Sequence, residues 1–283
     1  MPGDTTPDLT TGDHTAAVPV VNHAWKPSDG GKIQTELAIV LENVAAGYAK
    51  PNILDVKLGA RLWADDSPPE KRVKLDKVAE ETTSKPLGFR IAGMKAYHGP
   101  QETGDNHINA DGYRVFDKHY GRSLSVETVG QGFQEFFRVE DNVRPPAPIR
   151  KVIKRFMEDL EILAKSLKSK ESRMYSASLL FVYEGDFDVL EKSFTREADL
   201  VNAYNSRQNL ENNAEPNDTE IQQNDDFIED NDSDGHGQPD FPSIQNLKLI
   251  DFAHAHWAAG QGPDENLLHG VRNVIEILRG LLG

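Results

Sequence analysis

The sequence contains no cysteine and no apolar run of the roughly eighteen residues that a membrane-spanning helix requires. Disulfides, thiolate metal sites and cysteine nucleophiles are therefore excluded. Residues 1–12 are polar and lack both the basic start and the apolar run of a signal peptide. These absences predict a soluble protein of the nucleus or cytoplasm, in which the Asn-x-Ser/Thr matches at Asn217 and Asn231 carry no glycan.

Basic residues are few relative to acidic ones. Lys and Arg number 31 against 46 Asp and Glu, which gives a formal net charge of −15. Residues 205–241 hold eleven of the acidic residues and a single arginine, so about two thirds of the excess lies there. The remainder is only mildly acidic, which argues against direct nucleic-acid binding by bulk charge. Because residues 205–241 are also poor in large apolar side chains, we predict a disordered acidic insert.

A β-rich stretch begins at Pro51 and is predicted to form a strand over residues 51–63. Side chains on a strand alternate between its two faces, so Leu54, Val56 and Leu58 share one face and indicate a buried core. Asp55 and Lys57 share the other face. An acid–base pair in this place is expected either of a half-exposed surface strand or of a ligand site, because burying it without a partner is costly.

The remaining chain shows further periodic segments, preceded by a disordered lead-in at residues 1–17. Residue composition predicts strands within Thr35–Val44, Leu87–Tyr97, Met174–Tyr183 and Leu247–His254. Capping residues, prolines and three–four apolar spacing predict helices that begin near Glu70, Ser125 and Pro148, and a last helix over 264–282.

The β-rich runs at 174–183 and 247–254 flank the acidic insert, and we expect them to pair as a hairpin. In the second run Asp251 interrupts a strand that is predicted to be buried. An ionised carboxylate there needs a cation, either a basic side chain or a metal ion. In phosphoryl transfer a carboxylate so placed holds Mg²⁺ beside the nucleotide phosphates. Ile-Asp-Phe by itself is a weak signal.

Three motifs in one order are far more specific than any of them alone. They are Pro51-x-x-x-Asp55-x-Lys57-x-Gly59, Ser176-x-Ser178-Leu179-Leu180 and Ile250-Asp251-Phe252-Ala253-His254. With them the sequence resembles the inositol polyphosphate kinase family, its fungal and animal multikinases in particular. Supporting matches are Gly88-Phe89, Gly93-Met94-Lys95-Ala96-Tyr97 and His119-Tyr120-Gly121-Arg122-Ser123-Leu124. The resemblance runs from about Glu36 to the C-terminus, apart from the acidic insert.

The resemblance implies an α+β, two-lobed, SAICAR-synthase-like fold that is distantly similar to protein kinases. It also implies phosphorylation of inositol phosphates with ATP and Mg²⁺. For the nucleotide, it implies that backbone groups of Glu42 and Val44 hold adenine in a hinge. Asp55 would contact the ribose side of ATP, and Ser178 would lie on the nucleotide and metal side of the site.

For the reaction itself, the resemblance implies that Lys57 touches both the inositol substrate and the transferring phosphate. Asp251 would hold the metal ion, and His254 would lie near the inositol. These roles agree with the chemistry of the residues, because a loose, metaphosphate-like transition state needs positive charge and alignment more than covalent chemistry. Lys57 and an Asp251-bound Mg²⁺ are the predicted sources of that charge.

A basic face is the second part of the expected substrate site. Lys71, Lys74 and Lys77 recur at a spacing of three on the predicted helix, a pattern that is also expected of a solvated helix face. A substrate with several phosphates would explain such a face. The candidate phosphate-binding residues are Lys71, Lys74, Lys95 and Lys118.

The family pattern includes an N-terminal lobe ahead of the hinge, with a strand lysine that neutralises the ATP phosphates. Residues 18–47 are interpreted as a remnant of that lobe plus the hinge, with Lys26 and Lys32 in a turn context. Residues 48–283 are interpreted as the C-terminal lobe. The lobe is thus expected to be reduced or missing, which predicts either a truncated chain or a degenerate family member with weak or no activity.

Three functions remain open at this point. The first is a multikinase that phosphorylates inositol trisphosphate to the tetrakis- and pentakisphosphate. The second is a catalytically weak, kinase-like scaffold whose acidic tract 205–241 binds basic nuclear or transcription partners, although such tracts are usually solvated loops. The third is a related single-position or diphosphoinositol-forming kinase, which would differ only in the substrate pocket.

Overall fold

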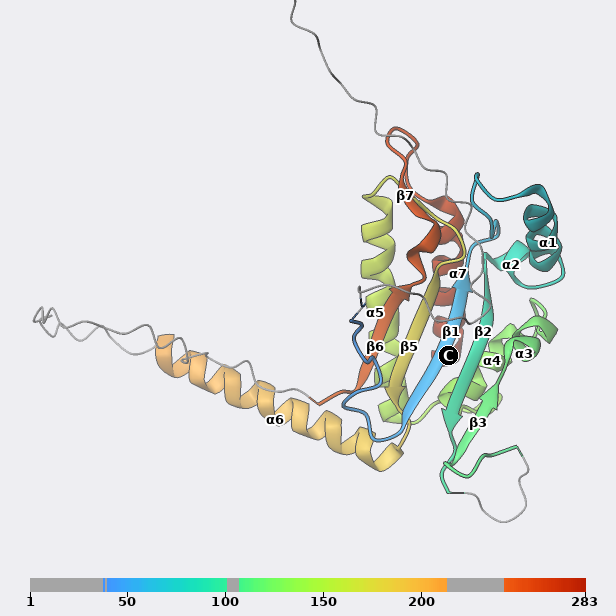
Figure 1. Cartoon of the computed structure of the whole chain (residues 1–283). Coiled ribbons are helices and arrows are strands. Elements are labelled where there is room, and N and C mark those ends of the chain that lie inside the picture. The colour runs from blue at the N-terminus through green and yellow to red at the C-terminus, as the bar shows by residue number, and fades with distance from the viewer. Residues whose placement is uncertain (1–37, 39, 101–106, 213–241) are drawn as a thin grey trace, which may run out of the picture. The chain divides into compact units, whose positions relative to one another are not determined.

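The computed structural model describes residues 38, 40–100, 107–212 and 242–283 (Figure 1). The chain divides into two compact units, residues 1–42 and residues 43–283. In the first unit, residues 38 and 40–42 are exposed and form no strand. The predicted lead-in and most of the predicted lobe remnant lie outside the described residues.

The strand predicted for Thr35–Val44 is wrong over the part that the structure describes. Residues 44–47 form a turn instead. The Asn43 side chain accepts a hydrogen bond from the Ala45 backbone N–H at 3.1 Å, and the Asn43 carbonyl accepts one from Ala46 N–H at 3.0 Å. Asparagine commonly closes turns in this way, and this local bonding outweighs the apolar pattern before it.

Residues 43–283 are built on a sheet of antiparallel strands: β1 (Pro51–Leu58), β2 (Phe89–Tyr97), β3 (Tyr113–Phe116), β5 (Ser178–Glu184) and β6 (Gln245–Ile250). Their order across the sheet is β3-β2-β1-β5-β6, which puts β1 at the centre (Figure 1). Strands β5 and β6 pair as predicted, with Ser178 opposite Ile250. A bulge interrupts the pairing of β1 with β2 between Asp55 and Val56.

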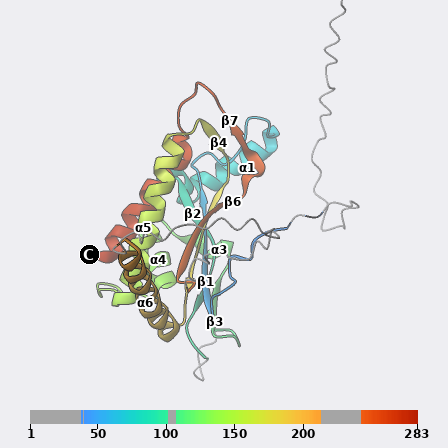
Figure 2. The same cartoon turned by 90° about the vertical axis from the view of Figure 1, so that its left-hand side faces the viewer.

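One face of the sheet carries the hydrophobic core. Leu54, Val56 and Leu58 are fully buried there, which confirms the alternation predicted for β1. Helices α4 (Val129–Phe137), α5 (Ala147–Lys168) and α7 (Glu265–Leu282) cover this face (Figure 2). The opposite face carries Asp55 and Lys57, so the central strand separates the core from the polar residues that the motifs single out.

Helices α5 and α7 confirm the predictions made from apolar spacing. In α5, Val152, Ile153, Phe156 and Leu160 are fully buried, and Pro148 lies in its first turn, where its missing N–H costs nothing. The α7 helix begins after Asp264, whose carboxylate accepts the Leu267 backbone N–H at 3.1 Å.

The strand predicted over residues 51–63 ends at Leu58. Two further predictions need correction. The helix predicted to start at Ser125 begins at Val129, because the Thr128 hydroxyl turns back to accept the Ser125 backbone N–H at 2.8 Å. The strand predicted through His254 ends at Ile250. It is half-buried rather than buried, because β6 is the outermost strand of the described sheet.

Helix α6 (Phe187–Asn212) is absent from the sequence prediction, and its last residues enter the tract 205–241 that was predicted to be disordered. Its first half packs on α5 through the buried residues Leu190 and Phe194, one turn apart. The Arg155 guanidinium also donates to the Glu197 carboxylate at 2.9 Å. These long-range contacts explain the helix, because its own sequence is only weakly amphipathic. Residues 213–241 lie outside the described residues.

The remaining elements frame the polar face and its surroundings. They are α1 (Pro69–Glu80), α2 (Ser84–Leu87), α3 (Lys118–Ser123), β4 (Ser172–Met174), the 3₁₀ turn η1 (Phe252–His254) and β7 (Ala255–Trp257), which pairs with β4. In the part of the chain that the structure describes, no helix is long and apolar enough to cross a membrane.

Candidate active site

The polar face of β1 brings together two residues that lie far apart in the sequence. The Lys57 ammonium is 3.3 Å from a carboxylate oxygen of Asp251, and it donates a second hydrogen bond to the Ser176 carbonyl at 2.8 Å. Lys57 stands near the end of β1, and Asp251 directly follows β6. The lysine side chain is 21% exposed and the aspartate side chain 55% exposed. A mobile ligand could therefore reach the pair from solvent.

Both partners of Lys57 have an unusual backbone. Ser176 has a φ of 58° and Asp251 a φ of 68°, in the left-handed region that residues with a Cβ rarely adopt. Such a conformation costs about 1–2 kcal/mol per residue and persists only where the surroundings impose it. The two strained residues turn a carbonyl and a carboxylate onto the same ammonium group, a concentration of strain typical of functional sites.

The structure explains why the first motif ends in a glycine, Gly59. Its φ is 103°, and a Cβ at this position would lie 2.8 Å from the Asn266 amide nitrogen and 2.9 Å from the Arg61 carbonyl. Its N–H donates to the Gly88 carbonyl at 2.7 Å. The glycine lets the chain turn sharply just after Lys57 and pack against the start of α7.

The half-buried Asp55 and the buried Ser178 lie beside Lys57, Asp55 on the same strand and Ser178 directly across from Lys57 on β5. Among the described residues, Asp55 Oδ1 and Ser178 Oγ are buried oxygens that make no hydrogen bond of ordinary length and angle, although the Ser178 hydroxyl lies close enough to Asp55 to lower the pKa of its carboxyl. Burial raises the pKa of the Asp55 carboxyl, and the Asp251 carboxylate acts in the same direction. The Ser178 hydroxyl and the Lys57 ammonium oppose this shift. A buried carboxylate with an unsatisfied oxygen is a place where a cation or a hydroxyl donor would bind favourably.

The donor chemistry fits a hard divalent cation. Mg²⁺ is usually held by one or two carboxylates together with substrate phosphates and water, rather than by a dedicated protein cage. The described residues contain no group of three or more His, Cys, Asp or Glu side chains that could form such a cage. They do place the exposed Asp251 carboxylate near the unsatisfied oxygens of Asp55 and Ser178.

On the other side of Lys57 lies a cationic pair that sequence reasoning missed. Arg90 is opposite Lys57 in the β1–β2 register and is buried, with its guanidinium donating to the Ser84 hydroxyl at 2.9 Å. Burial lowers the pKa of Arg90, and the positive charge of Arg122 lowers it further. Arg122 itself is exposed on α3. The available signal was that Arg90 directly follows the Gly88-Phe89 match, and that Arg122 lies inside the match that begins at His119.

Of the predicted phosphate-binding lysines, Lys71 contacts the turn that follows Asp251. Its ammonium is 3.5 Å from Nε2 of His254, in the 3₁₀ turn that follows Asp251. The structure therefore brings Lys71 and His254 together and connects them to Asp251. Lys74 is exposed one helical turn farther along α1.

Lys95 and Lys118 are placed less directly. Lys95 pairs with Ile53 across the β1–β2 ladder, so it lies on the same face as Asp55, but its ammonium sits over the Tyr113 ring at 4.9 Å. Lys118 is the first residue of α3 and is exposed. Glu42 belongs to the first unit and Val44 to the second. The predicted adenine contacts therefore stay predictions.

The arrangement defines the class of site. A lysine near the end of one strand meets an aspartate that directly follows another strand. Oxygen atoms able to ligate a metal ion lie on one side of this pair, and cationic side chains lie on the other. This arrangement suits a metal-assisted phosphate transfer between phosphorylated substrates. A family model described as inositol polyphosphate kinase matches residues 38–279. The chain belongs to the inositol polyphosphate kinase family.

Individual relatives agree with this assignment. An inositol polyphosphate multikinase of Saccharomyces cerevisiae is 34% identical over 84% of this chain and 67% of the relative. One of Schizosaccharomyces pombe is 29% identical over 88% and 70%, respectively. The crystal structure of the S. cerevisiae inositol phosphate multikinase with ADP and Mn²⁺ superposes with a TM-score of 0.58 and 31% identity, covering 85% of this chain and 82% of that one. These matches confirm the α+β, kinase-like fold class.

Proposed function

We propose that this chain is an ATP-dependent kinase of inositol polyphosphates that carries inositol trisphosphate to the tetrakis- and pentakisphosphate. The observation that carries the proposal is the contact of Lys57 with Asp251 at 3.3 Å, on the polar face of a strand whose other face is core. The two fungal relatives are named multikinases, and one solved relative is a complex with ADP and Mn²⁺. For this chain Mg²⁺ is the metal ion we propose.

The residues divide between the two substrates. Asp251 would hold the metal ion with the nucleotide phosphates, and Asp55 and Ser178 would offer their unsatisfied oxygens to the nucleotide side. A bound Mg²⁺ would neutralise phosphate charge and align the transferring group. Lys57, which donates a hydrogen bond to the Ser176 carbonyl, would direct its positive charge at the phosphoryl group between donor and acceptor.

The acceptor side is supported by a gathering of positive charge in a protein that is acidic as a whole. Arg90 and Arg122 lie near each other beside Lys57, and Lys71 reaches His254. Like charges repel, so this grouping favours a ligand that is itself strongly negative. An inositol ring with several phosphates has that property, and guanidinium groups bind phosphate oxygens through paired hydrogen bonds.

Phosphate transfer by the purified chain tests the proposal. ATP labelled at the γ-phosphate, Mg²⁺ and inositol 1,4,5-trisphosphate should yield labelled higher phosphates, and Asp251→Asn should abolish the product. Asp199→Asn is a matched control, because it makes the same chemical change at an exposed residue of α6 that lies outside every motif. Transfer that survives Asp251→Asn would contradict the proposal. So would a folded chain that binds both substrates, by calorimetry, without transferring phosphate.

A further inference from the structure

Helix α1, which carries Lys71 and Lys74, is not anchored by the hydrophobic core. Ala79 is its only buried residue, and Val73 is 70% exposed. Core packing does little to fix the position of a helix with so little buried apolar surface, so other contacts must fix it. Those contacts decide where the cations of α1 stand relative to Lys57.

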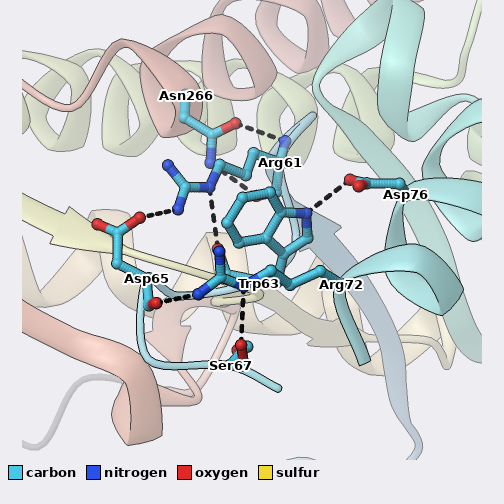
Figure 3. A network of polar contacts seen from close by, with 7 residues as sticks. All are labelled: Arg61, Trp63, Asp65, Ser67, Arg72, Asp76 and Asn266. Atoms are coloured by element: carbon cyan, nitrogen blue, oxygen red, sulfur yellow. Dashed lines mark hydrogen bonds and ion pairs between the residues drawn. The ribbon is translucent and has the colours of Figure 1, made fainter. Parts of the chain in front are cut away.

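Trp63, in the segment between β1 and α1, is the centre of these contacts. The guanidinium of Arg61 lies 3.8 Å from the centroid of the indole ring, and that of Arg72 lies 4.8 Å from it. The indole N–H donates to the Asp76 carboxylate at 2.6 Å (Figure 3). Arg72 and Asp76 are one turn apart on α1, so both point toward the same tryptophan.

The same side chains also fix the backbone of the connecting segment. Arg72 donates through Nε to the Ser67 carbonyl at 2.7 Å and through Nη2 to the Asp65 carbonyl (Figure 3). Arg61 donates to the Trp63 carbonyl at 3.1 Å and to the Asp65 carboxylate. The carboxylate of Asp65 is largely exposed, so that ion pair alone contributes little. The stacked indole and the bonds to carbonyls define the geometry.

The start of this segment, directly after β1, is held by hydrogen bonds to Asn266 and Ser176. Asn266 at the start of α7 accepts the backbone N–H groups of Ala60 and Arg61, both at 2.9 Å, and donates to the Arg61 carbonyl. The Ser176 hydroxyl donates to the Leu62 carbonyl at 2.9 Å. Ser176 is the residue whose own carbonyl holds Lys57. A continuous set of contacts therefore runs from Lys57 to helix α1.

We propose that Trp63, Arg72 and Asp76 are positioning residues that set the spacing between Lys57 and the cations of α1. They thereby determine how a polyphosphorylated ring is oriented for transfer. The inference rests on the proposed function, because it takes the ligand of α1 to be the inositol phosphate. It concerns only the acceptor side, since none of the three residues contacts Asp55, Ser178 or Asp251 in the structure.

Steady-state kinetics of the full chain separate a positioning role from a general structural one. Trp63→Leu and Arg72→Gln should raise KM for inositol 1,4,5-trisphosphate about 3- to 10-fold, the range expected for losing a cation–π contact of about 0.7–1.4 kcal/mol. KM for ATP should stay within about twofold, because the nucleotide side is untouched. Trp63→Phe keeps an aromatic ring and should restore most of the lost affinity.

Hydrogen exchange of α1 amides supplies a readout that does not depend on activity. Trp63→Leu should speed exchange in residues 70–80, whereas Lys77→Gln, which removes only an exposed i,i+4 ion pair with Glu81, should not. Unchanged α1 exchange together with an unchanged inositol phosphate KM would overturn the inference, as would equal rises in both KM values. If the unmodified chain transfers no phosphate, the proposed function fails, and the exchange experiment still decides whether these residues position α1.

Discussion

The two faces of strand β1 share one backbone and have opposite effects on the folded chain. On one face Leu54, Val56 and Leu58 are fully buried in the core. Removing such a side chain from water stabilises the fold by about 1.5–3 kcal/mol. On the other face Asp55 is half-buried, its pKa is raised mainly by that burial, and one of its oxygens makes no hydrogen bond of ordinary geometry with the described residues.

The comparison shows how one strand can serve both purposes. The apolar face fixes the strand, so the polar face can hold groups whose burial costs stability. Ser178, directly across from Lys57 in the β1–β5 register, repeats the pattern with a fully buried, unsatisfied hydroxyl. Substitutions on the core face should therefore change stability and leave chemistry intact. Substitutions on the site face should change the chemistry much more than they change stability.

The largest expected effect lies on the site face. Lys57→Met removes the ammonium and keeps the length of the side chain. We expect kcat/KM to fall about 100- to 1000-fold, equivalent to about 3–4 kcal/mol of transition-state stabilisation. The free energy of unfolding should change by no more than about 1 kcal/mol, because the ion pair is partly exposed.

Parallel kinetics and urea unfolding check this outcome, with Lys154→Met as the charge-matched control. A loss of activity accompanied by an equal loss of stability would contradict the separation of the two faces.

The core face should give the second largest effect and the opposite pattern. Val56→Ala deletes two fully buried methyl groups between Asp55 and Lys57. The lost burial and the cavity should lower the free energy of unfolding by about 2 kcal/mol. The variant that remains folded should keep a kcat near that of the unmodified chain. Urea unfolding and kinetics below the transition measure both quantities, and a kcat reduced more than about tenfold would show that the two faces are coupled.

Local patterns carried most of the fold. Alternation in β1 and the three–four spacing of α5 report on which residues face a core, and the structure confirms both. The α6 helix was not predicted because it is held by contacts between different elements. Arg155 of α5 contacts Phe194 and Glu197 of α6, and these residues are too far apart in the sequence for a local pattern to relate them. The strand predicted through His254 ends at Ile250, because tertiary contacts impose a left-handed backbone conformation at Asp251.

The candidate site was partly predictable for the same reason. The motif residues Lys57 and Asp251 meet, and Lys71 meets His254, although their catalytic roles stay predictions. Arg90 was missed, because its relation to Lys57 depends on the pairing of β1 with β2. The stack of guanidinium groups on Trp63 was likewise invisible, since cation–π contacts have no spacing rule in sequence.

The smallest expected effect is a pH-dependent one at Asp55. A carboxyl whose pKa is raised in the folded chain binds its proton more tightly there than in the unfolded chain. Its contribution to stability is therefore complete below the ordinary carboxyl pKa and decreases as pH rises through the raised value. Asp55→Asn removes this titration while keeping the shape of the side chain.

The free energy of unfolding of Asp55→Asn, minus that of the unmodified chain, should therefore increase from pH 4 to pH 7. Urea unfolding of both chains over this range, without nucleotide or metal ion, measures the difference. Glu127→Gln is a suitable control, because Glu127 is exposed and its pKa is lowered by the Ser125 hydroxyl, so its difference should decrease over the same interval. A decreasing difference for Asp55→Asn would mean that Lys57 and Ser178 outweigh burial, and that the polar face of β1 stabilises the free chain.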